Sequence, residues 1–221
     1  MWESGAAVRR DGDGESGSSE PPFVALTQDE VSRCLLSLDD TQHRAIFTMQ
    51  AELGLSTAEI LGDSTIGTRG VYIQDVDSKA MKLKIYYRGV KKSGFTTRVV
   101  PVTIECKRAL RDYLSSMAMS FHDEGKIFDI SDRRWRQVLL EVQEKTKIPK
   151  KISALVLRRT AIINMLRSGM KADEVRRRVG ILREQEEFAV FAIAYVLNSP
   201  EDYDTWIKQT MLDKAIGSRP R

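Results

Sequence analysis

The stretch Ala154–Ile181 constrains the fold of this chain more than any other segment. Its sequence, ALVLRRTAIINMLRSGMKADEVRRRVGI, has the spacing of two basic amphipathic helices that are separated at Ser168-Gly169. Ser153 precedes the first helix and belongs to the residue types that cap helix N-termini. Gly180 follows the second helix. The segment therefore predicts a pair of helices that carry several arginines on their surfaces.

Positive charge is concentrated in the same region of the chain. The formal net charge of the whole protein is +4. Residues 1–22 contain two arginines and five acids, so residues 23–221 carry a net charge of +7. Residues 147–183 hold eleven lysines and arginines against two acids, a local net charge of +9. Such charge favours a polyanionic partner because each neutralised phosphate releases counterions. The alternative is a solvated charged face on ordinary helices.

Composition excludes several other classes of protein. Hydrophobic residues make up 42% of the 221 residues, which is enough for the core of one domain. No apolar run approaches the ~20 residues needed to span a bilayer, so we expect no membrane partner. Arg9 and Arg10 are not followed by the apolar segment of a signal peptide. Cys34 and Cys106 lie far apart in apolar segments, so we expect two buried free thiols and no metal site.

Three parts are expected along the chain. Residues 1–22 have the composition of a disordered acidic tail, residues 23–198 form the folded domain, and residues 199–221 form a C-terminal helix and tail that packs in cis or in trans. Thr27 followed by Glu30 is a capping box that opens the first helix. The patterning predicts helices near residues 27–36, 39–53, 56–61, 105–119, 131–145, 154–167 and 184–197, and strands at 71–76, 82–87 and 97–102.

Several short blocks follow one another in a specific order. They are LTQDEV from Leu26, GLSTAEIL at Gly54–Leu61, RVVP at Arg98–Pro101, LRRT at Leu157–Thr160, and Val179-Gly180. In this order and spacing, the blocks resemble the tyrosine recombinase (phage integrase) family over residues 26–197. The resemblance implies an α+β fold, the mostly helical catalytic domain of that family with a small antiparallel β-sheet.

The resemblance also implies a chemistry. Tyrosine recombinases are expected to break DNA by attack of a tyrosine hydroxyl on phosphorus. Two arginines stabilise the charge on the phosphate oxygens, a lysine from a hairpin turn protonates the leaving oxygen, and two histidines assist. Lys92 and Arg158 match the lysine and the second arginine. Ser56 stands at the position of the first arginine, and Leu155 and Ile181 stand at the two histidine positions.

The nucleophile and two possible departures from the family pattern also bear on whether the chain cuts DNA. Family spacing puts the tyrosine at Val190 or Phe191, and neither side chain has a hydroxyl. Tyr195 lies one helical turn after Phe191 and is a fallback nucleophile, the alternative being a tyrosine packed in an apolar helix. Arg69 is the candidate substitute for the missing first arginine. Leu155 is expected to be a core leucine.

The resemblance and the charge together predict a degenerate recombinase domain that binds double-stranded DNA without cleaving it, in an architectural or regulatory role. We expect a cytoplasmic, nucleoid-associated protein without a cofactor. Two alternatives remain, an active minimal recombinase or integrase that uses Tyr195 with Arg158 and Lys92, and an interaction module that dimerises through its C-terminal helix. The residues expected to contact DNA are Arg88, Lys91, Lys92, Arg98, Lys150, Lys151, Arg158, Arg159, Arg167, Arg176, Arg177 and Arg178.

Overall fold

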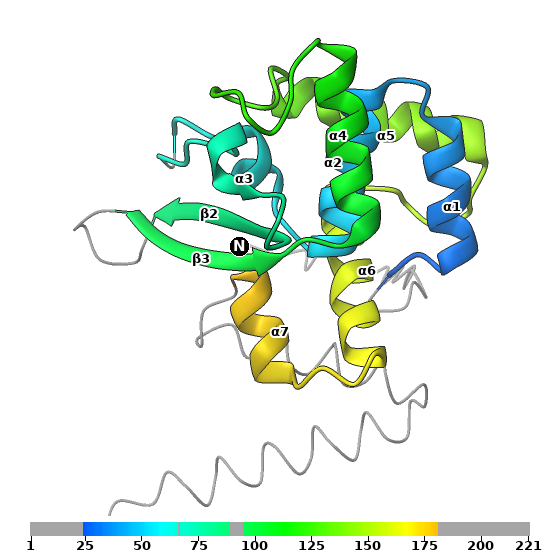
Figure 1. The fold of residues 1–221 in the computed structure, drawn as a ribbon. Helices are drawn as coiled ribbons and strands as arrows, with labels where there is room; N and C mark the ends of the chain where they lie inside the picture. The colour runs from blue at the N-terminus through cyan, green and yellow to red at the C-terminus, as the bar shows by residue number, and fades with distance from the viewer. Residues whose placement is uncertain (1–23, 66, 89–94, 181–221) are drawn as a thin grey trace, which may run out of the picture.

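A computed structural model of the protein describes residues 24–65, 67–88 and 95–180, with backbone alone at positions 87, 88, 95, 96, 172 and 173. Helices α1, α2, α4 and α5 form one body, the sheet lies beside it, and α6 and α7 extend below (Figure 1). The predictions for residues 1–22, for the tip of the hairpin and for the helices after Gly180 lie outside the described residues.

Local capping explains where most of the helices begin. Before each of the first six α-helices stands a Ser, Thr or Asp whose side-chain oxygen accepts a hydrogen bond from the backbone amide three residues later. This confirms the capping box of Thr27 and Glu30 and the cap at Ser153. The helices are α1 (Gln28–Ser37), α2 (Thr41–Leu53), α3 (Thr57–Leu61), α4 (Ile104–Ser116), α5 (Asp132–Thr146), α6 (Ala154–Arg167) and α7 (Ala172–Val179).

The sheet is antiparallel, with strand order β1-β2-β3. Strands β2 (Lys82–Arg88) and β3 (Phe95–Pro101) form the predicted hairpin, in which Leu83 pairs with Val100 and Ile85 pairs with Arg98. Because side chains alternate between the two faces of a strand, Arg98 shares the buried face with these three apolar residues. This register brings a charged side chain into the interior of the protein.

The strand predicted at residues 71–76 is wrong for most of its length. Residues Ile73–Asp75 form a 3-10 helix, η1, and only the two-residue strand β1 (Val76–Asp77) pairs with β2. The cause is Asp75, whose carboxylate accepts a hydrogen bond from the amide of Tyr72 at 3.1 Å. That bond closes the backbone into a turn, which competes with the extended conformation.

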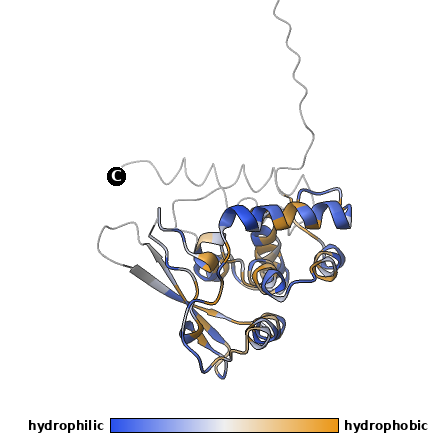
Figure 2. Ribbon diagram, turned by 90° about the horizontal axis from the view of Figure 1, so that it is seen from above, coloured by the Kyte–Doolittle hydropathy of each residue, from blue (hydrophilic) through white to orange (hydrophobic). Residues whose placement is uncertain are grey.

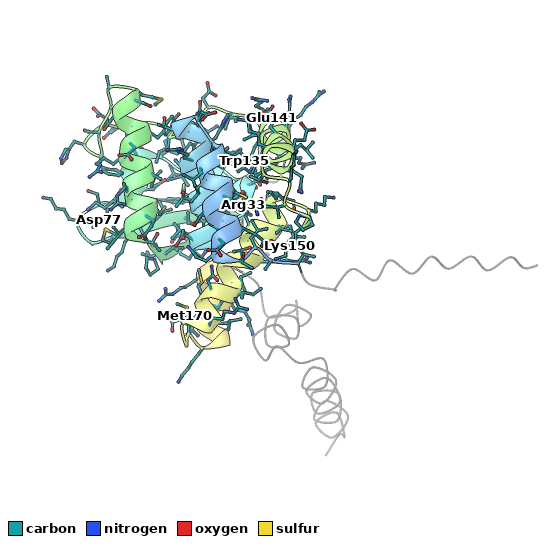
Figure 3. All side chains as sticks on the ribbon, turned by 90° about the vertical axis from the view of Figure 1, so that its right-hand side faces the viewer. Arg33, Asp77, Trp135, Glu141, Lys150 and Met170 are labelled. Carbon is teal, nitrogen blue, oxygen red and sulfur yellow. The ribbon has the colours of Figure 1, made fainter. Side chains whose placement is uncertain are left out.

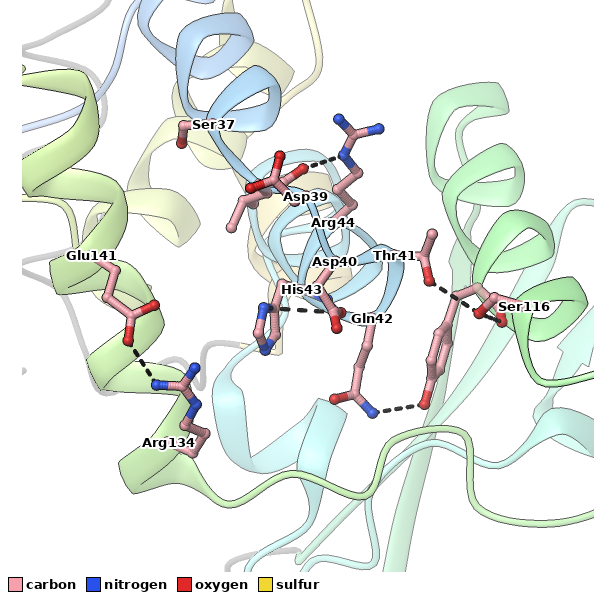
Figure 4. Close-up of polar contacts among 12 residues, drawn as sticks. Ser37, Asp39, Asp40, Thr41, Gln42, His43, Arg44, Ser116, Arg134 and Glu141 are labelled. Atoms are coloured by element: carbon pink, nitrogen blue, oxygen red, sulfur yellow. Dashed lines mark hydrogen bonds and ion pairs between the residues drawn. The ribbon is translucent and has the colours of Figure 1, made fainter.

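Helix α2 is the centre of the hydrophobic core and packs against α4 and α6. Its buried Gln50 accepts a hydrogen bond at 3.0 Å from the indole nitrogen of Trp135, which is fully buried on α5. At the other end of α2, the side-chain amide of Gln42 donates a hydrogen bond to the hydroxyl of Tyr113 on α4 (Figure 4). The ring of His43 lies 6.3 Å from that of Trp135. The colouring in Figure 2 shows hydrophobic positions turned inward between these helices. Cys34 and Cys106 are free and buried, as predicted; the burial raises the pKa of both thiols.

The lower part of the molecule has a small hydrophobic cluster of its own. Ile162 on α6 packs with Val175 and Val179 on α7, and partly buried Met165, Leu166 and Met170 join them. Figure 3 shows Met170 at the lower end of this pair, beyond the main body. Outside this cluster, α7 is joined to β3 by a hydrogen bond from Nε of Arg98 to the carbonyl oxygen of Arg178.

Candidate nucleic-acid interface

The candidate interface lies where α3, β3, α6 and the end of α7 meet (Figure 1). Three charged side chains gather there, Glu59 from α3, Arg98 from β3 and Arg158 from the second turn of α6. They come from segments that are 39 residues or more apart in the chain. Each has partners that fix its position, and these are described in turn.

The short helix α3 holds Glu59 by a capping box. The hydroxyl oxygen of Ser56 accepts a hydrogen bond from the amide of Glu59 at 3.3 Å, and Oε2 of Glu59 accepts one from the amide of Ser56 at 2.9 Å. The Ser56 hydroxyl, at the position where the resemblance calls for the first arginine, therefore serves to begin a helix. No sequence prediction assigned Glu59 to the site, although the spacing of Ser56 and Glu59 is the capping-box signal.

Arg98 is an interior residue, which corrects its place among the surface residues predicted to contact DNA. Its Nη1 donates to Oε1 of Glu59 at 2.5 Å, and both side chains are 9% exposed. Its Nε donates to the carbonyl oxygen of Arg178 at 2.8 Å. Arg98 thus joins β3 to α3 and to the end of α7. The alternation of side chains along β3 puts Arg98 on the inner face of the sheet. Its partners could not be found from the sequence, because they are far from Arg98 along the chain.

Arg158, which the sequence analysis matched to the second arginine, is mostly buried. Its side chain is 17% exposed. Nη2 donates to the carbonyl oxygen of Val179 at 2.7 Å, and Nη1 lies 3.6 Å from Oε2 of Glu59. Burial lowers the pKa of Arg158, the charge of Glu59 opposes this effect, and the charge of Arg98 adds to it. A group in this setting gains from an additional anion.

Glu59 is an anion in this cluster despite its burial. Burial by itself would raise the pKa of this carboxyl group. The hydrogen bond and charge of Arg98, together with the charge of Arg158 and the amide of Ser56, outweigh burial and hold the pKa below its ordinary value of 4.5. The cluster therefore contains a buried carboxylate shared by two guanidinium groups.

Glycine is required at two positions beside the cluster. Gly180 has a φ of +73°, and a Cβ atom there would lie 2.3 Å from Nη1 of Arg98. Gly54, at the end of α2, has a φ of +67°, and a Cβ atom there would lie 2.7 Å from Cγ1 of Val179. Both glycines belong to blocks that carry the resemblance. Their physical role here is to let backbone approach Arg98 and α7 closely.

Leu155 is on the surface, so its prediction as a core leucine is wrong. Its side chain is 57% exposed, whereas its neighbours Val156 and Leu157 are buried. As the second residue of α6, Leu155 precedes Arg158 by three positions and shares its helix face. An exposed apolar residue therefore lies about one helical turn before Arg158 on α6. It has no proton to donate, unlike the histidine expected from the resemblance.

Both histidines of the chain lie away from Arg158. His43 is at the start of α2, close to Asp40, and burial lowers its pKa. His122 is in the loop after α4. Neither histidine therefore takes the place of the two family histidines, whose positions are occupied by Leu155 and Ile181. Ile181 itself lies outside the described residues.

Arg69, the candidate substitute for the first arginine, is anchored elsewhere. Its Nη2 donates to Asp75 at 2.5 Å, and its guanidinium carbon lies 3.9 Å from the ring centroid of Tyr86 and 4.5 Å from that of Tyr72. These contacts use both the charge and the faces of the guanidinium group. The geometry gives Arg69 a structural role beside the sheet.

The other predicted DNA-contacting residues fall into three groups. Lys151, Arg167 and Arg177 are exposed, and Arg159 and Arg176 are partly buried. Lys150 pairs with Glu30 of α1 at 2.7 Å, at the position labelled in Figure 3, and Arg178 pairs with Glu174 at 2.6 Å. The side chain of Arg88 and all of Lys91, Lys92 and Tyr195 lie outside the described side chains.

The part of the chain that the structure describes holds no group of three or more His, Cys, Asp or Glu side chains placed to bind a metal ion. Within that same part, no helix is long and apolar enough to cross a membrane.

The helical body and the small antiparallel sheet form a tyrosine recombinase or integrase-like catalytic-domain fold. The XerA recombinase is similar with a TM-score of 0.61 and 22% identity, over 91% of this chain and 68% of that one. XerH bound to its difH substrate has a TM-score of 0.58 and 12% identity, over 77% of this chain and 50% of that one. The catalytic domain of bacteriophage HP1 integrase has a TM-score of 0.50 and 15% identity, over 84% and 94%. No protein-family model and no curated protein matches the sequence.

Replacing Gly180 with alanine should destabilise the protein by about 2–4 kcal/mol, because the methyl group strains a left-handed backbone and displaces Arg98 from its buried carboxylate. Urea unfolding followed by circular dichroism measures the change. The matched control is Gly169→Ala, since Gly169 has a φ of +87° but a Cβ atom there meets nothing within 4 Å. An equal loss of unfolding free energy in the two variants would show that Arg98 is not held tightly.

The stability contributed by Glu59 should depend on pH. Since the folded-state pKa of Glu59 is lowered, its contribution is present above the ordinary value of 4.5 and is lost as the pH falls through the folded-state value. Glu59→Gln should therefore destabilise the protein by roughly 2–3 kcal/mol at pH 7, and by less at pH 3. Equilibrium unfolding at the two pH values checks this. A loss that is the same at both would contradict it.

Proposed function

We propose that this protein binds double-stranded DNA through Arg158 and the basic residues of the segment 147–183, and that it does not cleave DNA. The observation that carries the proposal is the make-up of the Arg158 site. A partly exposed arginine lies there beside a serine that caps a helix and an exposed leucine. Such a site can attract a phosphate but has lost groups needed to transfer one.

The chemical argument rests on charge and protons. Attack on phosphorus builds negative charge on the phosphate oxygens, and each missing preorganised donor costs about 10²–10³ in rate. Ser56 supplies a neutral hydroxyl whose oxygen is occupied by capping α3. Leu155, which is exposed at the position of the first family histidine, supplies no proton. The combined losses leave rate acceleration far below that of a complete site.

Binding needs fewer groups than cleavage. Phosphate contacts come from lysines and arginines on an accessible surface, and they position a protein on DNA without reading its sequence. Exposed Lys151, Arg167 and Arg177 can supply such contacts. Among similar structures, XerH is described in complex with difH substrate and the Tn1549 transposon integrase in complex with circular intermediate DNA, at 12% and 14% identity. Their complexes are consistent with the same fold serving DNA binding in this chain.

Binding to a linear duplex should be strongly salt-dependent. We expect measurable affinity at about 50 mM salt that weakens at least tenfold by 200 mM, since several phosphates are neutralised. Arg158→Ala and Arg177→Ala should each weaken binding about three- to tenfold in fluorescence anisotropy. Arg111→Ala is the matched control, because Arg111 is an exposed arginine on α4, outside the proposed surface. No binding at 50 mM, or an equal loss in the control, would refute the proposal.

No covalent protein–DNA adduct should form with a nicked suicide substrate. The measurement is denaturing gel electrophoresis after incubation at high protein concentration. An adduct that disappears in Tyr195→Phe would instead establish the alternative of an active minimal recombinase that uses Tyr195 with Arg158 and Lys92.

A further inference from the structure

The carboxylate of Glu59 is shared unequally between two arginines. Oε1 accepts the hydrogen bond from Arg98 at 2.5 Å, while the nearest approach of Arg158 is 3.6 Å, to Oε2. Oε2 also accepts the amide of Ser56 at 2.9 Å. Both carboxylate oxygens of Glu59 therefore accept hydrogen bonds from groups other than Arg158. Arg158 has the weaker hold on this carboxylate and the greater exposure of the two arginines.

Arg98 is held in a position from which it binds the carboxylate of Glu59 closely. Its Nε is tied to the carbonyl oxygen of Arg178, and its guanidinium group passes over Gly180, where a side chain would collide with it. Glu59 is fixed as well, because its own helix begins with the capping box to Ser56. The unequal sharing is thus built into three elements and does not depend on a mobile side chain.

A phosphate that binds the exposed part of Arg158 would come within a few ångströms of this buried carboxylate. Two negative charges repel at that range, and the repulsion is only weakly screened because Glu59 is buried. The carboxylate and the phosphate therefore oppose each other at the same guanidinium group.

We propose that Glu59 acts as an internal counter-anion that lowers the phosphate affinity of Arg158, and that Arg98 limits this effect by binding the carboxylate more closely. This inference rests on the proposed function in DNA binding. It names the two side chains, Glu59 and Arg98, that set the phosphate affinity of Arg158. Arg98 contributes to DNA binding as a positioning residue, from the interior, and does not touch the phosphate.

The first test is Glu59→Gln, which keeps the size and one hydrogen-bond acceptor of the side chain and removes its charge. We expect this variant to bind a 25-base-pair duplex about three- to tenfold more tightly at 50 mM salt, by fluorescence anisotropy. The matched control is Glu141→Gln, which makes the same change in net charge at an exposed glutamate paired with Arg134 on α5. The control should stay within about twofold of the wild type.

The second test separates the two arginines by a double-mutant cycle. Arg98→Met should weaken binding at least tenfold, because the released carboxylate then pairs with Arg158. Arg98→Met combined with Glu59→Gln should restore affinity to within about threefold of the wild type, since the competitor is gone. If Arg98 instead contacted DNA directly, the loss of DNA affinity would persist in the double variant. That result would overturn the inference.

Folding is checked separately for each variant by far-ultraviolet circular dichroism and thermal unfolding, with binding measured at 10 °C. Glu59→Asp retains the charge with a shorter side chain, and should stay within about twofold of the wild type. If folded Glu59→Gln protein binds DNA no more tightly than the wild type, the inference about Glu59 is overturned and the proposed DNA binding stands. Wild-type protein that binds no duplex at all would overturn the proposed function.

Discussion

The buried carboxylate of Glu59 links α3, β3 and α6, which also meet in the hydrophobic core, and through its two arginines it reaches the end of α7. It begins helix α3 through its capping box with Ser56, accepts a hydrogen bond from Arg98 on β3, and lies near Arg158 on α6. The two arginines then bond the last carbonyl groups of α7. Removing one partner from such a buried pair leaves an uncompensated charge, so the geometry of four elements depends on this one group.

The same arrangement bears on the DNA binding that we propose for this site. Arg158 donates a hydrogen bond to the end of α7, and its side chain is more exposed than that of Arg98, which makes the closer contact with the carboxylate of Glu59. A phosphate-binding arginine needs both rigidity and residual positive potential. At the surface around it, Leu155 provides neither charge nor protons. These features support the proposal that the site holds an anion without transforming it.

Local signals made much of the fold predictable. Ser, Thr and Asp caps define where helices begin because their bonds span three residues, and the blocks around Gly54, Arg98 and Gly180 indicated the recombinase-like fold. The segment at 71–76 was misassigned, since its apolar alternation hid the turn formed by Asp75. Leu155 was misassigned because helical periodicity alone does not say which face of α6 the core covers.

The sequence by itself determined which chemical groups are present, with an arginine at 158 and no histidine at 155, and where most helices begin, because these depend on residue identity and short-range bonds. Only the tertiary structure decided which charges are buried and how they are shared. Arg98 meets Glu59 across 39 residues and the Arg178 carbonyl group across 80. Such contacts depend on how β3 packs against α3 and α7, and that packing sets the distances on which the charge sharing depends.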